Sequence, residues 1–366
     1  MYFCRVLSAL FFTVVLTGLF LLGQEILLWR FLQKGLRENT IPQDQALTPL
    51  SVLICAHNEE VALRQNLPLV LLQQHPQYKV WVGLDHCSDR SLEVVQQWAK
   101  HFPHLKYMER QGQKPSKKAM QGQLIAAAEY PSLVFTDADC RPASPQWLAA
   151  YSQAFQQGQL ILGVGLLHSK SPFMNALVQW ETAQTALLYQ AAAFRQKPYM
   201  GVGRNMGYRQ ELYKPEYTQP RLRSGDDDLL VNALSGKVKT AVIQAPETFT
   251  YSAAPDSWAG WWRQKRRHHS TAFYYRRSQQ FSLALRGLGQ VVFWPGVVLG
   301  LAYHPLAALL AGALRYLITL ILQWRSYHHF KACLGLLTFP FWETVWAWSV
   351  LGIHIQNIVK KRTHEW

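Results

Sequence analysis

Two aspartates separated by one small residue follow an apolar run at residues 133–139, where the chain reads Leu-Val-Phe-Thr-Asp-Ala-Asp. Carboxylate oxygens suit hard divalent ions, and Mg2+ or Mn2+ is usually held by one or two carboxylates together with phosphate oxygens. Asp137 and Asp139 therefore fit a site for a metal-bound phosphate. An Asx turn that closes a strand would give the same pattern, so the pair needs support from the rest of the chain.

Strand and helix patterns alternate ahead of this pair. Apolar runs typical of buried strands occupy residues 51–56, 79–84, 105–108 and 133–135, with helix-like stretches between them. This alternation predicts βαβ units and a parallel sheet. Since ligands bind at the carboxyl ends of parallel strands, we expect the polar residues that follow these runs to line one crevice.

Two further runs end in polar clusters, residues 57–60 (His-Asn-Glu-Glu) and residues 85–89 (Asp-His-Cys-Ser-Asp). Carboxylates accept hydrogen bonds from a base or ribose, and Lys114, Lys117 and Lys118 supply positive charge for a diphosphate. Any one of the polar residues could instead be a turn residue or a helix cap. Together the clusters and lysines predict a nucleotide site.

Three stretches of the second half also carry candidate site residues. Residues 201–209 are rich in glycine, which lets substrate approach the backbone, although a turn into a helix at RQELY is an alternative. Asp226, Asp227 and Asp228 precede an apolar helix, where like charges raise one another's pKa and acids also favour the helix N-terminus. Residues 261–269, WWRQKRRHH, form the most basic and aromatic patch and also fit a membrane-surface anchor.

In this order the motifs AHNEE, VWVGLDHCSD, KPSKKAM and VFTDADC resemble the family 2 inverting glycosyltransferases with a GT-A fold, over roughly residues 50–275. The resemblance implies an α/β fold with a nucleotide-sugar-binding, Rossmann-like mixed sheet, a nucleotide-sugar donor that is expected to be UDP-linked, and Mg2+ or Mn2+. It implies that Asp85 contacts the base, that Asp139 binds the metal directly and that Asp137 lies nearer the ribose and diphosphate, although these last two roles could be exchanged. The implied nucleotide-binding residues are Ala56, His57, Glu59, Asp85, Lys117, Lys118 and Asp137.

The same resemblance assigns the reacting groups. Asp226 aligns with the general base that deprotonates the acceptor hydroxyl, and Asp227 is the alternative because the run departs from the usual Glu-Asp spelling. Gly203 and Asn205 fall in the segment before the acceptor region. Gln264 and Arg267 match the Q-x-x-R-W motif, which implies contacts to diphosphate or acceptor, and His268 stands where that motif has Trp.

Apolar segments flank the predicted enzyme domain. Residues 6–29 are long enough to span a bilayer and lack a signal-peptide cleavage pattern, and the positive charges that follow them place residues 50–280 in the cytoplasm. We predict an anchor at 1–36, a linker at 37–49, a GT-A domain at 50–280 and a membrane region at 281–366. The last region contains two crossings plus a re-entrant or interfacial segment, or three crossings.

Arg315 lies near the middle of the second of these C-terminal apolar segments. An ionisable group at that depth is costly, which indicates a buried partner or a lipid phosphate. Snorkelling of the long side chain along a shifted register is the commoner explanation for such a residue, and it is the one that we expect here.

Composition supports a membrane enzyme. The chain has 366 residues, a formal net charge of +15 and 49% hydrophobic residues, which fits a membrane or an acidic ligand, and no nucleic-acid-binding motif appears. The five cysteines have neither disulfide-framework nor zinc-site spacing. We predict an integral membrane glycosyltransferase of a bacterial-type cell membrane, acting on a lipid or saccharide acceptor and contacting membrane lipids. A processive polysaccharide synthase and a non-catalytic sugar-nucleotide sensor are the alternatives.

Overall fold

The structure, a computed structural model, describes residues 2–38, 47–112, 114–218, 222 and 224–363. The chain divides into two compact units. The sheet unit comprises Lys34–His168 and Leu188–Ala254, and the helical unit comprises Met1–Gln33, Ser169–Leu187 and Pro255–Trp366. The domain boundaries expected from composition stay a prediction, and residues 39–46 of the expected linker lie outside the described residues.

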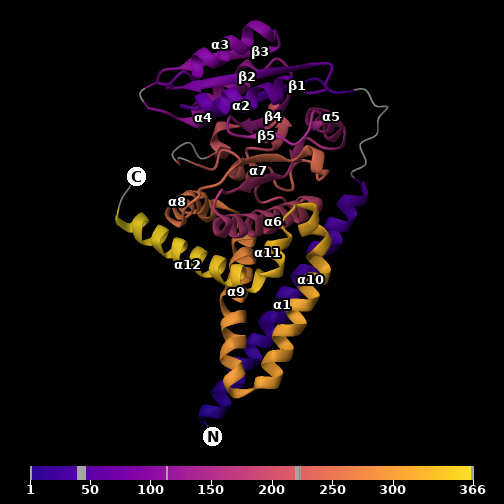
Figure 1. The fold of residues 1–366 in the computed structure, drawn as a ribbon, viewed down its shortest axis with the longest axis vertical. Helices are drawn as coiled ribbons and strands as arrows, with labels where there is room; N and C mark the ends of the chain where they lie inside the picture. Colours follow the sequence, from indigo (N-terminus) through magenta and orange to yellow (C-terminus); the bar gives the residue numbers. More distant parts are fainter. Residues whose placement is uncertain (1, 39–46, 113, 219–221, 223, 364–366) are drawn as a thin grey trace. The chain divides into compact units, whose positions relative to one another are not determined.

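A seven-stranded mixed sheet forms the centre of the sheet unit, in the order β3-β2-β1-β4-β8-β6-β9 (Figure 1). The first four strands in this order pair in parallel, whereas β8 runs antiparallel to both β4 and β6, and β6 pairs with β9 in parallel. The strands are β1 (Leu50–Ala56), β2 (Tyr78–Asp85), β3 (Leu105–Arg110), β4 (Ser132–Asp137), β6 (Leu160–Leu162), β8 (Met206–Arg209) and β9 (Thr240–Val242).

Helices between the strands bury the apolar faces of this sheet. Leu63 and Leu67 of α2 and Val94 of α3 pack in one cluster with Val52 and Val80 of the sheet, because these positions recur at helical and strand spacing. The helices are α2 (Glu60–Leu71), α3 (Ser91–His101), α4 (Lys117–Ala127), α5 (Trp147–Gln157) and α7 (Asp228–Leu234), with 3-10 helices at Gln210–Leu212, Pro215–Thr218 and Pro246–Thr248. Burial of these side chains explains why the first strands read as continuous apolar runs.

The predicted βαβ half is confirmed, since all four expected strands are present. The later part of the unit differs from the prediction in one place. Residues 206–209 form the inner strand β8, and only a 3-10 turn follows them instead of the alternative helix at RQELY. A second sheet, β5-β10-β7, contains β5 (Arg141–Pro142), β7 (Gly165–His168) and β10 (Thr250–Ala253).

Helices make up the helical unit. They are α1 (Tyr2–Glu38), α8 (Trp258–His269), α9 (Arg277–Tyr303), α10 (Pro305–His329), α11 (Cys333–Leu337) and α12 (Phe339–Thr363), with a 3-10 helix at Ala272–Tyr274; α6 (Pro172–Phe194) begins in this unit. Within the described part of the chain, three helices are long and apolar enough to cross a membrane, namely residues 12–30 of α1, α9 and α10. This supports membrane anchoring, and α12 does not meet the same criterion.

Small residues let α1 and α9 pack closely (Figure 1). A Cβ atom added at Gly18 would lie 2.4 Å from the ring of Phe293, and one at Gly296 would lie 2.3 Å from Val14. Close backbone approach through small residues is the usual way in which helices associate in a bilayer, where lipid is as apolar as the side chains.

Arg315 pairs inside the helical unit. Its Nη2 atom donates to both carboxylate oxygens of Glu343 at 2.8 and 2.6 Å, lies 3.7 Å from Glu25 Oε1, and its guanidinium stacks 4.5 Å from the centroid of Phe293. Gln290 donates to the same carboxylate at 3.0 Å. Since Arg315 is only 1% exposed, the favoured expectation of snorkelling is wrong for this side chain, and the other interpretation, a buried partner, is confirmed.

This pairing predicts a large loss of stability when Glu343 is truncated. Glu343→Ala would leave the buried guanidinium without its closest partner, and such changes cost roughly 3–5 kcal/mol. We expect a clearly lower melting temperature in detergent. Ser349→Ala on the same helix is the control, because within the described part of the chain its hydroxyl bonds only to the Val345 carbonyl. Equal melting temperatures for the two variants would contradict the assignment, and replacing Glu343 and Arg315 together by Met should recover part of the loss.

Candidate active site

The polar clusters predicted at the strand ends meet at one edge of the main sheet. Strand β1 lies between β2 and β4, and Cys55 at its end is in register with Gly83 of β2 and Asp137 of β4. Because all three strands are parallel, the loops that follow them emerge side by side. The sheet therefore brings residues 57–60, 85–89 and 137–140 together, as predicted.

Asp85 is already engaged within this edge. One of its oxygens accepts from Arg110 and from His86, each at 2.8 Å, and the other accepts from the Ser116 amide at 2.5 Å. Burial alone would raise the pKa of Asp85, but the hydrogen bonds from His86, Arg110 and Ser116 outweigh burial and hold that pKa below its usual range. Ionised Asp85 thus holds the loop after β2 in place through these hydrogen bonds. Its partner Arg110 was not identified by any sequence motif.

The first cluster is tied to the same loop. His57 Nδ1 donates to the Asp85 carbonyl at 2.6 Å, and the Ala56 carbonyl accepts from Cys87 at 3.7 Å. The Glu59 amide donates to Ser91 Oγ at 2.9 Å. Desolvation by burial, followed by the negative charges of Asp139 and Asp137, raises the pKa of Glu59.

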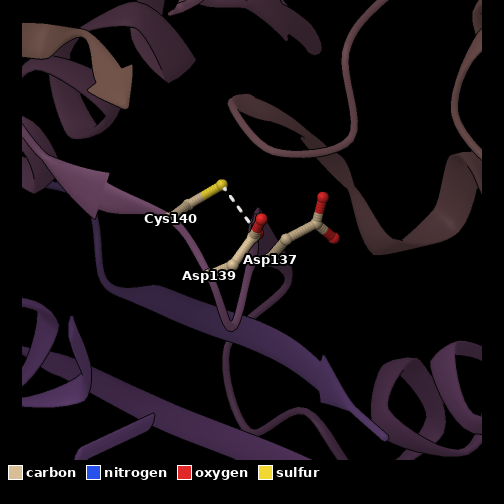
Figure 2. A group of neighbouring side chains, drawn as sticks. All are labelled: Asp137, Asp139 and Cys140. Atoms are coloured by element: carbon tan, nitrogen blue, oxygen red, sulfur yellow. Dashed lines mark hydrogen bonds between the residues drawn. The ribbon is translucent and has the colours of Figure 1, made fainter. Parts of the chain in front are cut away.

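The loop after β4 carries the candidate metal ligands, Asp137 and Asp139, next to Cys140 (Figure 2). Ligand atoms of these three side chains all lie within 4.8 Å of one another. Burial raises the pKa of the Cys140 thiol, which stays protonated and donates to Asp139 Oδ1 at 3.5 Å. A protonated thiol is a poor ligand for a hard ion, so the two carboxylates are the part of this group that fits Mg2+ or Mn2+.

The two carboxylates differ in their surroundings. Asp137 Oδ1 accepts from Lys117 Nζ at 2.6 Å, whereas Asp139 forms no ion pair within the described residues, although the charges of Arg204 and Lys117 act on it from farther away. Partial desolvation, followed by the charge of Asp137, raises the pKa of Asp139. A divalent cation beside Asp139 would relieve this repulsion, and phosphate oxygens would complete its coordination.

Lys117 joins the metal side of the site to the candidate base. Its Nζ atom lies 3.7 Å from Asp226 Oδ2 as well as 2.6 Å from Asp137 Oδ1. Burial would lower the pKa of Lys117, but Asp137 and Asp226 raise that pKa well above its ordinary value, so the amine stays charged. Lys118, by contrast, donates to the Thr218 carbonyl at 2.5 Å.

Asp226 and Asp227 have different environments although they are adjacent. The side chain of Asp226 is 12% exposed and faces Lys117, whereas both oxygens of Asp227 accept from backbone amides, Gly203 at 2.7 Å and Asp228 at 2.8 Å. Asp227 therefore caps helix α7 and holds the glycine segment. An added Cβ at Gly203 would lie 3.1 Å from Asp227 Oδ2, so a larger residue here would press on the carboxylate that accepts from the Gly203 amide.

Burial, followed by the charges of Asp226 and Asp228, raises the pKa of Asp227 to about 7 and predicts pH-dependent stability. Because the ordinary pKa of an aspartate is 3.8, the folded chain keeps a proton on Asp227 at pH values where the unfolded chain has released it. The stability that protonated Asp227 gives to the fold is therefore fully present below about pH 4 and is lost as the pH rises through about 7. The free energy of unfolding falls by roughly 4 kcal/mol over this range. We expect the melting temperature to fall from about pH 5 to pH 7, and to fall less in Asp227→Asn. A Glu216→Gln variant should keep the full slope, and an equal slope in all three proteins would contradict the assignment.

Asn205 differs from its expected role at the acceptor. It is fully buried, its Oδ1 accepts from Trp147 at 2.9 Å and Tyr151 at 2.8 Å, and its Nδ2 donates to the Val164 and Thr248 carbonyls at 2.7 and 3.0 Å. Since every polar position of this amide is occupied by protein, Asn205 supports the glycine segment from beneath.

The remaining predicted residues lie on α8 in the helical unit. Lys265 and Trp261 point inward and share the buried carboxylate of Glu181, with Trp261 Nε1 donating at 3.1 Å. Arg267 and His268 are exposed and contact each other at 3.0 Å. These contacts fix the rotation of the helix, and the approach of Gln264, Arg267 and His268 to a substrate stays a prediction.

Comparison with known proteins identifies the family and the fold of the chain. Residues 48–271 match the family described as "Glycosyltransferase like family 2". A comparison with curated proteins gives no match.

Among solved structures, the chain is similar to the mannosyltransferase PcManGT from Pyrobaculum calidifontis in complex with GDP-Man and Mn2+, at 15% identity and a TM-score of 0.63, over 97% of this chain and 99% of that one. It also matches S. aureus TarS 1-349 in complex with UDP-GlcNAc, at 15% identity and a TM-score of 0.45, over 78% and 90%. At such identity the likeness to PcManGT concerns the fold alone, and that fold is GT-A.

Proposed function

Because the chain belongs to glycosyltransferase family 2, we propose that it moves a sugar from a nucleotide-sugar donor, expected to be UDP-linked, to a lipid acceptor at the cytoplasmic membrane face, with inversion at the anomeric carbon. The observation that carries this proposal is the position of Lys117. One ammonium group lies 2.6 Å from Asp137 and 3.7 Å from Asp226, so the groups expected to face the donor diphosphate and the acceptor hydroxyl are next to each other.

The residues divide the reaction between them. Asp226 takes the proton of the acceptor hydroxyl, the oxygen forms a bond to the anomeric carbon, and the bond from that carbon to the diphosphate breaks with its electron pair leaving on the nucleotide. No enzyme nucleophile is needed, because a single displacement inverts the centre. Lys117 provides positive charge beside the leaving diphosphate, where preorganised charge has its largest effect.

Asp139 and Asp137 would hold Mg2+ or Mn2+. When bound, the ion would neutralise charge that develops on the departing diphosphate. Asp85, Glu59 and His57 form the wall expected to face the nucleoside, with Asp85 kept ionised by Arg110. Gln264 and Arg267 are proposed contacts to the diphosphate or acceptor. The buried Oε1 of Gln264 has no hydrogen-bond donor within the described residues, which favours a hydroxyl-bearing ligand there.

A lipid acceptor is supported by the three helices, among the residues that the structure describes, that are long and apolar enough to cross a membrane. The placement of the enzyme at the cytoplasmic face rests on the positive charges after residue 29.

A screen of nucleotide-sugar donors, in which the mass of each product is measured, tests the proposal. The purified full-length protein in nanodiscs of a membrane lipid extract would be incubated with Mn2+ and, separately, UDP-glucose, UDP-galactose, UDP-GlcNAc and GDP-mannose, the last because PcManGT binds GDP-Man. We expect release of the nucleoside diphosphate from one donor together with a lipid product one sugar heavier. A long polymer would instead identify a synthase. Nucleotide binding without turnover of any donor would identify a sensor and contradict the enzyme assignment.

A further inference from the structure

The small sheet β5-β10-β7 carries a row of three side chains on one face. Tyr251 of β10 is directly opposite Arg141 of β5, and Ala253 of β10 is in register with His168 of β7. Opposite residues share a face, as do residues two apart along a strand. Arg141, Tyr251 and His168 therefore line the same face, and burial of the alternate position Ser252 agrees with this assignment.

Stacking holds the row in place. The rings of His168 and Tyr251 are stacked with centroids 5.4 Å apart and an interplanar angle of 28°, and the Arg141 guanidinium carbon lies 5.9 Å from the Tyr251 centroid. Because β10 is the middle strand, Tyr251 lies between the other two side chains. Stacking uses the face of a guanidinium and leaves its N–H edge for a ligand.

Arg141 has no carboxylate partner. Among the residues that the structure describes, none forms an ion pair or a side-chain hydrogen bond with this exposed guanidinium, although acidic groups are frequent nearby in the sequence. The positive charge of the row is thus not neutralised by protein, unlike that of Arg110, which pairs with Asp85 at 2.8 Å.

The row also adjoins the candidate metal ligands. Asp139 lies in the turn after β4, where the Cys140 amide donates to the Asp137 carbonyl at 3.0 Å, and Arg141 begins β5 two residues later. The hydroxyls of Thr136 on β4 and Thr250 on β10 both donate to the Arg204 carbonyl at 3.1 Å, which ties the small sheet to the end of β4.

We propose that Arg141, Tyr251 and His168 form a phosphate-binding subsite beside the metal carboxylates, a proposal that rests on the proposed function. The guanidinium edge offers two parallel N–H donors that match a phosphate, and the phenol adds a further donor. The phosphate belongs either to the nucleotide donor or to the acceptor, and the two sources can be separated by experiment.

Binding measurements on the full-length protein in detergent test the subsite. The first arm compares UDP, GDP and uridine in the presence of Mn2+ for wild type and Arg141→Gln. Loss of a bidentate charged contact should weaken UDP or GDP binding roughly 10- to 100-fold and leave uridine unchanged if the donor supplies the phosphate. The second arm titrates inorganic phosphate into protein saturated with UDP and Mn2+. A wild-type binding event that Arg141→Gln lacks would assign the subsite to the acceptor.

Three further variants control the experiment. Lys106→Gln removes an exposed positive charge on β3 and should bind every probe as wild type does. Tyr251→Phe keeps the stack and should lose only the hydroxyl contribution, and Arg141→Lys should restore part of the affinity. Wild-type affinity of Arg141→Gln for nucleotides and phosphate would overturn the subsite alone. Failure of the wild type to bind any nucleotide would overturn the proposed function and this inference with it.

Discussion

Asp226→Asn is expected to lower sugar transfer by a factor of roughly 100 to 10,000, the usual effect of removing a general base. The amide keeps the size of the side chain but cannot accept the proton of the acceptor hydroxyl. Asp226 faces Lys117 at 3.7 Å, whereas both oxygens of Asp227 are occupied by backbone amides, so Asp226 is the better placed of the two to reach a substrate. Initial rates of nucleoside diphosphate release with the donor found in the screen would measure the effect.

A measurement of nucleotide binding distinguishes the loss of the general base from damage to the whole site. Asp226→Asn removes a negative charge near the diphosphate, so its affinity for the nucleotide with Mn2+ should equal or exceed that of the wild type. Glu216→Gln, which changes an exposed acid in the segment before α7, should keep full activity. If Asp226→Asn keeps activity within tenfold of the wild type and Asp227→Asn does not, the base is Asp227 and its backbone contacts must open during the reaction.

The first half of the fold was predictable because the residue pattern of each strand matches the environment of that strand in the folded sheet. Strands β1, β2 and β4 are buried on both faces and therefore read as apolar runs, and each ends in polar residues. Strands such as Leu160–Leu162 and Thr240–Val242 are only three residues long, too short to show a period. Their place in the sheet depends on partners distant in sequence.

Residue types predicted the site less well than they predicted the fold. An Asn in a glycine-rich segment suggested a substrate contact, but Asn205 bonds to Trp147 and Tyr151 of a helix more than fifty residues earlier in the chain. Arg141 carries no motif, and its relevance follows only from the pairing of β5 with β10. Hydropathy likewise could not show that Glu343 lies against Arg315. In each case the decisive contact is long-range, and pattern alone does not encode it.

Asp139→Asn is expected to abolish the dependence of nucleotide binding on the metal. Asp139 forms no ion pair within the described residues, whereas Asp137 already pairs with Lys117, so Asp139 is the better candidate for direct coordination. Loss of a direct ligand should weaken Mn2+ binding by about 100-fold or more, since even outer-shell changes cost 10- to 100-fold. Isothermal titration of UDP with Mn2+ and with EDTA would measure the affinity, and Mn2+ electron paramagnetic resonance would report the ion directly.

Cys140→Ala distinguishes a carboxylate site from a mixed one. The thiol is buried, its raised pKa keeps it protonated, and it donates to Asp139 rather than offering a thiolate. Cys140→Ala should therefore retain Mn2+ affinity within a few fold. The Mn2+ affinity of Asp137→Asn should lie between those of Cys140→Ala and Asp139→Asn. Asp137→Asn also removes the carboxylate that pairs with Lys117. A larger loss in Asp137→Asn than in Asp139→Asn would exchange the two roles. Unchanged Mn2+ binding in both aspartate variants would contradict a metal site on this loop and leave Lys117 as the principal positive charge beside the diphosphate.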